Sequence, residues 1–126
     1  MPPFIYTARE LYDWLTAREE IVVVDVRNHD DFARFKVEGP YPFTLLNIPY
    51  FDFMESEQEC LARLPGGARV RVVCASEASA RYVAEIVHKG GFADVGFLQG
   101  GINSWGNLLV PRQLPTPDHY QLCQFV

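Results

Sequence analysis

Apolar runs alternate with helical patterns along most of this chain. The continuous run from Ile21 to Val24 is typical of a strand that is covered on both faces, as in a parallel sheet. Further strands are predicted at Thr44 to Asn47, at Val70 to Val73 and at Asp94 to Leu98. Because helical segments separate these strands, the connections should be right-handed crossovers. The sequence therefore predicts an α/β fold with a mostly parallel central sheet flanked by helices.

Capping signals mark where several of the helices begin. Thr7 to Glu10 and Ser56 to Glu59 both match the capping box, in which a hydroxyl and a carboxylate satisfy the first backbone amides. Asn28 is positioned to cap a short helix from Asp30 to Phe35, and a longer helical pattern runs from Arg81 to Val87. The first helix carries three apolar side chains on one face: Leu11, Trp14 and Leu15.

Cys74 lies where the third predicted strand turns towards the long helical pattern. The small residues from Ala75 to Ala80 form the connection. In such a turn, successive backbone N–H groups point at one spot, and the helix N-terminus adds a partial positive charge. That surrounding favours the thiolate, which is the nucleophilic form of cysteine. The alternative is an inert cysteine, buried at a strand end as a small hydrophobic residue.

Four segments, in this order and spacing, resemble the rhodanese family. They are Asp25-Val26-Arg27, Asn47-Ile48-Pro49, the Cys74 loop and the segment from Leu98 to Trp105. The resemblance covers nearly the whole chain to about Val110. It implies a small α/β domain whose loop cysteine accepts a sulfane sulfur as a persulfide and passes it to another nucleophile.

This resemblance makes Cys74 the catalytic candidate and places the substrate around it. The candidate substrate-binding residues are those of the anion cradle and of the pocket rim: Ala75, Ser76, Glu77, Ala78, Ser79, Ala80, Gly100 and Gly101. The two rim glycines are expected at a tight turn or at positive φ, with their amides lining the pocket. Asp25 and Arg27 are expected to orient the turn that follows them, and Trp105 is expected to pack in the core.

The cysteine loop departs from the common sulfurtransferase pattern. That pattern has a cation beside the cysteine, a glycine in mid-loop and Arg or Thr further on, where this chain has Ala75, Glu77 and Ser79. Thiosulfate is a dianion, so a loop without a cation should bind it poorly. We therefore expect weak thiosulfate activity, a low-molecular-weight persulfide such as that of glutathione as donor, and a thiol as acceptor. Arg81 is positioned to offset the charge of Glu77.

Two other function classes compete with persulfide chemistry. In phosphatase-like relatives an arginine closes the loop six positions after the cysteine, where this chain has Ala80, so phosphatase and arsenate chemistry are disfavoured. A non-catalytic rhodanese-fold module that positions a partner domain or a thiol protein is the second hypothesis. The retained Cys74 favours the enzyme, and the missing cation favours the module.

Composition narrows the remaining possibilities. The chain has 126 residues, a size typical of one domain, and a net charge of -5 with its basic residues scattered, which disfavours nucleic acid as a partner. No apolar stretch reaches membrane-spanning length. The chain has three cysteines, which lie far apart in the sequence: Cys60, Cys74 and Cys123. An odd number at such spacing suits free thiols in a reducing cytoplasm. The three histidines share no metal-ligand spacing, so no metal or cofactor is expected.

The last residues have a different character from the rest. We expect a rhodanese-like domain over residues 1–110, and over 111–126 a Pro-rich linker with the possible start of a following domain. The chain, including Tyr120 to Val126, also resembles the N-terminal rhodanese domain of bacterial fusion proteins whose second domain has a metallo-β-lactamase fold. That resemblance implies such a domain as a partner within a longer natural chain.

Overall fold

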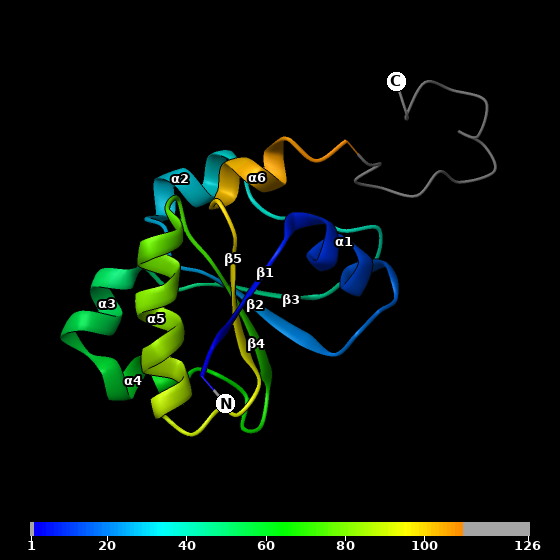
Figure 1. Ribbon diagram of the computed structural model, residues 1–126. Coiled ribbons are helices and arrows are strands. Elements are labelled where there is room, and N and C mark those ends of the chain that lie inside the picture. The colour runs from blue at the N-terminus through cyan, green and yellow to red at the C-terminus, as the bar shows by residue number, and fades with distance from the viewer. Residues whose placement is uncertain (1, 110–126) are drawn as a thin grey trace.

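A computed structural model describes residues 2–109, and it confirms the predicted α/β architecture (Figure 1). Within these residues, the strands form one sheet in the order β1-β5-β4-β2-β3, and every neighbouring pair is parallel. The strands are β1 (Phe4–Tyr6), β2 (Ile21–Asp25), β3 (Thr44–Asn47), β4 (Arg69–Val73) and β5 (Val95–Leu98).

Helices cover both faces of this sheet (Figure 1). They are α1 (Ala8–Thr16), α2 (His29–Arg34), α3 (Tyr50–Glu55), α4 (Glu57–Ala62), α5 (Glu77–Lys89) and α6 (Ile102–Gly106). One core layer joins α3, α4 and α5 to the sheet, and the other joins α1 and α6 to its opposite face. The strand β2 contributes Val22 and Val24 to the first layer and Val23 to the second, as the period of two in a strand requires.

The capping predictions had different outcomes. The Thr7 box is confirmed: the Thr7 hydroxyl accepts from the Glu10 amide at 3.1 Å, and the Glu10 carboxylate accepts from the Thr7 amide at 2.9 Å. Asn28 also caps as predicted, with its side chain accepting from the Asp31 amide at 2.7 Å, although the helix spans His29–Arg34.

The second capping box, at Ser56, was wrong. Ser56 does precede α4, but its side chain makes no capping hydrogen bond. The reason is that α3 ends at the same residue, where the Ser56 amide donates to the Asp52 carbonyl at 2.7 Å. The two helices abut, and Ser56 takes a φ of -139° and a ψ of 56° that suit the junction between them. The sequence had indicated only an apolar run where α3 forms.

Val110 to Val126 lie outside the described residues, so the division at residue 110 and the linker remain predictions. Among residues 2–109, no helix has the length and hydrophobicity needed to cross a lipid bilayer.

Candidate functional site

Cys74 stands at the carboxyl end of β4, directly before the turn into α5. β4 lies inside the sheet, between β5 and β2, so this position faces the edge at which parallel α/β sheets bind their ligands. The side chain is a free thiol with 5% of its surface exposed. The next residues, Ala75 to Ala78, are exposed, so the thiol lies just beneath an open turn.

The connection after Cys74 is shorter than the sequence indicated, because α5 begins at Glu77. Ser76 is its N-cap: the Ser76 hydroxyl accepts from the Ser79 amide at 3.2 Å and donates to the Ser79 hydroxyl at 3.0 Å. The Ala80 amide donates to the Ser76 carbonyl at 3.3 Å. The amides of Ser79 and Ala80 are therefore used within the helix.

This arrangement leaves four of the six amides of the predicted cradle available. The amides of Glu77 and Ala78, in the first turn of α5, have no partner within residues 2–109, and neither do those of Ala75 and Ser76. Such orphan N–H groups at a helix N-terminus favour a negative charge close to them. The binding role assigned to the whole run from Ala75 to Ala80 remains a prediction.

The glycine turn after β5 packs directly against the cysteine turn. Gly100 and Gly101 both have positive φ, 74° and 73°, as the sequence predicted. A Cβ at Gly101 would lie 2.3 Å from the Ala75 carbonyl oxygen, so only glycine fits there. The Ile102 amide donates to the Cys74 carbonyl at 2.8 Å and fixes the two turns together.

The Gly100 amide already has a partner. It donates to Oε1 of Glu77 at 3.0 Å, across the space between the two turns. This contact differs from the expectation that the glycine amides face an open pocket. The suggested compensation of Glu77 by Arg81 is not found either, because Arg81 lies 3.6 Å from the Glu85 carboxylate.

Asp25 and Arg27 form a buried ion pair at the same end of the sheet. Nη2 of Arg27 lies 2.8 Å from Oδ2 of Asp25, and Nε of Arg27 donates to Oδ1 at 3.1 Å. The guanidinium also donates to the carbonyls of Asp31 and Phe35. With its donors used in this way, Arg27 supports the turn as predicted and presents no open cation to a substrate.

Sequence reasoning missed the role of Asn47 at this edge. Its Nδ2 donates to the carbonyls of Asp25 and Arg27, both at 3.0 Å, and its Oδ1 lies 2.6 Å from Nδ1 of His29. Asn47 therefore ties the end of β3 to the turn after β2. The motif Asn47-Ile48-Pro49 was significant only as part of a resemblance, because nothing local indicates partners twenty residues away.

Cys60 provides a contrast with Cys74 within the same protein. It lies on α4, buried in the core layer of α5, where burial and the negative charge of Asp52 raise the pKa of its thiol. The neutral thiol is thus favoured at Cys60. Cys123 lies outside the described residues. Trp105 is fully buried, as expected for a packing role.

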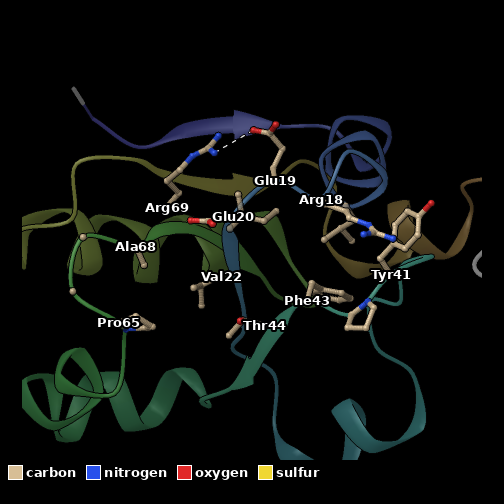
Figure 2. Close-up of a pocket in the computed structure, with 15 residues that line it drawn as sticks. Arg18, Glu19, Glu20, Val22, Tyr41, Phe43, Thr44, Pro65, Ala68 and Arg69 are labelled. Atoms are coloured by element: carbon tan, nitrogen blue, oxygen red, sulfur yellow. Dashed lines mark hydrogen bonds and ion pairs between the residues drawn. The ribbon is translucent and has the colours of Figure 1, made fainter.

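A groove lies at the end of the sheet opposite to Cys74 (Figure 2). It is a groove of about 940 Å³ at the amino ends of β2, β3 and β4, where Arg18 stacks over the Tyr41 ring at 3.7 Å. Its size alone would suit a ligand. Its lining contains no cysteine, and Cys74 lies at the far end of β4, so the groove is separate from the candidate site. Among residues 2–109, no group of three His, Cys, Asp or Glu side chains is arranged to hold a metal ion.

Comparison with known proteins agrees with this geometry. The rhodanese-like domain family matches residues 7–108. The chain belongs to that family. It is 30% identical over 107 residues to the probable adenylyltransferase/sulfurtransferase MoeZ of Mycobacterium tuberculosis, covering 83% of this chain and 25% of MoeZ.

Solved structures share the rhodanese-like fold. The single-domain sulfurtransferase RDL2 of Saccharomyces cerevisiae superposes with a TM-score of 0.65 at 22% identity, covering 83% of this chain and 89% of that one. A thiosulfate sulfurtransferase of Pseudomonas aeruginosa gives a TM-score of 0.64 at 29% identity, covering 82% of this chain and 18% of that one. The chain thus spans about a quarter of its curated relative, and the family supports a sulfurtransferase domain.

Proposed function

We propose that this rhodanese-like domain accepts a sulfane sulfur on Cys74 and passes it to a thiol. The observation that carries the proposal is the position of Cys74, at the carboxyl end of a central strand and directly before the orphan amides of α5. Unpaired amides at a helix N-terminus stabilise a negative charge close to them, which here would be that of a thiolate or of the persulfide that it forms.

The two half-reactions balance without an outside oxidant or reductant. The Cys74 thiolate attacks the outer sulfur of a donor R–S–SH. An S–S bond forms at Cys74 while the S–S bond of the donor breaks, and R–S⁻ leaves with the electron pair and takes up the proton. An acceptor thiolate then attacks the outer sulfur of the Cys74 persulfide and releases Cys74 as a thiolate.

The donor that suits this site is a low-molecular-weight persulfide, such as that of glutathione, in preference to thiosulfate. The turn from Ala75 to Ala80 contains no cation, and the one charge in it is the carboxylate of Glu77. Arg27, the buried cation at this edge, is paired with Asp25. A dianion approaching Cys74 therefore meets repulsion with little compensation.

Persulfide transfer is tested by loading the protein with glutathione persulfide and mapping the added sulfur by peptide mass spectrometry. Wild type and Cys60→Ser should each gain one sulfur at Cys74 that a reductant removes, and Cys74→Ser should gain none. Cys60→Ser is the matched control because Cys60 is also buried and free. Persistent loading of Cys74→Ser would refute the assignment.

The second candidate function is a non-catalytic rhodanese-fold module that positions a partner domain or thiol protein. The contact between Glu77 and the Gly100 amide favours it, since a carboxylate of the chain itself takes one of the donors expected for an anion. Failure of Cys74 to accept sulfur from any persulfide, in a protein that folds normally, would support this alternative.

We also propose that the domain works in the cytoplasm beside a metallo-β-lactamase-fold domain of the same natural chain. The support for the partner domain is the resemblance of the sequence as far as Val126 to such fusions, and the curated relative, of which the matching region is one quarter, is an example of such a domain within a longer chain. The support for the cytoplasm is that Cys60 and Cys74 are free thiols. If residues 111–126 are a linker, removing Val110 to Val126 should change the unfolding midpoint little. A large loss of stability would contradict the division at residue 110.

A further inference from the structure

The side chain of Glu77 bridges the two turns that surround Cys74. Its Oε1 accepts from the Gly100 amide at 3.0 Å, although the two residues are 23 positions apart in sequence. The neighbouring Gly101 packs on the Cys74-Ala75 backbone, and the Ile102 amide binds the Cys74 carbonyl. The carboxylate is thus held between the glycine turn and the turn that follows Cys74.

The charge of Glu77 is not balanced by a neighbouring cation. None of the ion pairs within residues 2–109 includes Glu77. The two arginines that stand nearest in the sequence and at this edge of the sheet have other partners, since Arg81 pairs with Glu85 and Arg27 with Asp25. A negative charge without a cationic partner among the described residues therefore remains beside the turn that follows Cys74.

We infer that Glu77 is a specificity-determining residue that selects reagents for Cys74 by charge. Its carboxylate occupies the Gly100 amide, which an incoming anionic group would otherwise use, and it repels anions by its field. Persulfide donors R–S–SH, whose transferred sulfur is bonded to an uncharged sulfur, react at Cys74, and donors with a sulfonate-like group beside the transferred sulfur are held back. The donor class rests on the function proposed above, whereas the charge selection concerns Cys74 whatever its reaction.

Alkylation of Cys74 tests the charge selection without any sulfur transfer. Iodoacetamide is neutral and iodoacetate is an anion of similar size, so the ratio of their rates reports the local field. The rates are measured at Cys74 by peptide mass spectrometry, which separates it from the other cysteines. Removing one exposed negative charge should raise the iodoacetate-to-iodoacetamide ratio roughly three- to tenfold, because charges in contact with solvent interact almost as weakly as in bulk water.

Two variants separate charge from hydrogen bonding. Glu77→Gln keeps an oxygen that accepts from the Gly100 amide and loses only the charge, whereas Glu77→Ala loses both. The ratio should rise in both variants, and further in Glu77→Ala, which also frees the Gly100 amide for an incoming anion. If Glu77→Gln behaves like wild type, the charge has no role and the inference is overturned. Glu85→Gln, eight residues later on α5, is the matched control and should leave the ratio unchanged.

Loading by sulfur donors extends the test to the proposed function. The quantity measured is the loading rate of Cys74 by the dianion thiosulfate divided by its loading rate by glutathione persulfide. In both Glu77 variants this ratio should exceed the wild-type ratio by roughly ten- to a hundredfold. If Cys74 is loaded but the preference does not change, the inference fails alone. If neither donor loads any of the proteins while the alkylation ratio rises as expected, the proposed function fails and the charge selection by Glu77 is supported.

Discussion

The two ends of the central sheet differ in whether their charged side chains have partners of opposite charge. At the amino end, Arg69 pairs with Glu19 at 3.1 Å and with Asp94 at 3.0 Å, so a groove of about 940 Å³ is bordered by charges that neutralise one another. At the carboxyl end, the cation Arg27 is used by Asp25, and Glu77 keeps its charge beside Cys74. The comparison teaches that the candidate nucleophile, Cys74, lies at the end of the sheet where a carboxylate has no cationic partner among the described residues, and away from the groove.

At the amino end, even the buried cation Arg71 has a carboxylate partner within the fold. Arg71 is only 2% exposed and lies over the rings of Phe4 and Trp14, at 4.8 Å and 4.7 Å, with its Nη1 at 2.8 Å from Asp94. Its Nε has no hydrogen bond within the described residues. Aromatic faces and one carboxylate therefore hold this buried cation. The Arg71 guanidinium therefore binds groups of the protein itself and is not exposed to a ligand.

The largest effect should come from breaking the ion pair at the carboxyl end. Arg27→Met leaves the Asp25 carboxylate buried without its cation, which should lower the free energy of unfolding by about 3–5 kcal/mol. Denaturant unfolding followed by circular dichroism measures this. Arg9→Met, which removes an exposed pair with Asp13, is the control and should cost less than about 1 kcal/mol. Equal losses in the two variants would contradict the structural role of Arg27.

Two glycines with the same φ sharpen the comparison between the ends. Gly101, at the cysteine turn, and Gly67, at the groove, both have a φ of 73°. Gly101→Ala adds a clash with the Ala75 carbonyl to the strain of positive φ, so it should cost about 2–4 kcal/mol. Gly67→Ala meets nothing within 4 Å and should cost about 1 kcal/mol. Thermal unfolding of both proteins checks this, and similar midpoints would mean that the two turns are not in tight contact.

A cation added at the carboxyl end should restore thiosulfate chemistry. Glu77→Gly with Ser79→Arg removes the carboxylate and supplies a charge-assisted hydrogen bond worth about 1.5–3 kcal/mol. If that bond forms mainly in the transition state, thiosulfate kcat/KM should rise roughly ten- to a hundredfold. Steady-state kinetics with cyanide as acceptor measures the change.

The control for this variant is Thr44→Arg, which adds the same cation at the groove and should have no effect on turnover. A gain from Thr44→Arg as large as that from the double variant would show that the two ends do not differ as described. Strong thiosulfate activity in the unmodified protein would also contradict the account of Glu77.

The smallest effect should come from Asp94 at the amino end. Burial acts to raise the pKa of this carboxyl group, but hydrogen bonds and charges from Arg71 and Arg69 outweigh it and hold the pKa below its ordinary value. A carboxyl group whose pKa is lower in the folded state stabilises the fold above its unfolded pKa, and that stability is lost as pH falls through the folded pKa.

Asp94→Asn should therefore lower the stability by about 1 kcal/mol at neutral pH, because the amide oxygen of Asn can still accept from Arg71 and the carboxylate that it replaces is 40% exposed and partly screened by solvent. The difference from wild type should shrink below about pH 4. Unfolding curves across this pH range test the sign. A difference that stays constant into strong acid would mean that the carboxylate charge is not what stabilises the pair.

The sequence by itself determined the α/β class and the position of Cys74 before a helix, although it did not predict β1. Ile21 to Val24 predicted a strand covered on both faces, and every residue of β2 is buried. The Thr7 box and the Asn28 cap were correct because each depends on atoms within three residues. Cys74 was placed correctly before a helix N-terminus for the same reason, since a strand, a short turn and a helical pattern follow one another in the chain.

The tertiary structure decided which groups around Cys74 are engaged. The Ser56 signal failed because α3, which the sequence did not predict, ends at the same residue. Asn47 and Glu77 bind partners about twenty residues away, and those distances in sequence carry no local pattern. Strand order brings the glycine turn after β5 onto the turn after β4, and only that neighbourhood places the Gly100 amide at the Glu77 carboxylate. Periodicity and capping report near neighbours, whereas the charge beside the turn that follows Cys74 depends on which distant segments the fold brings together.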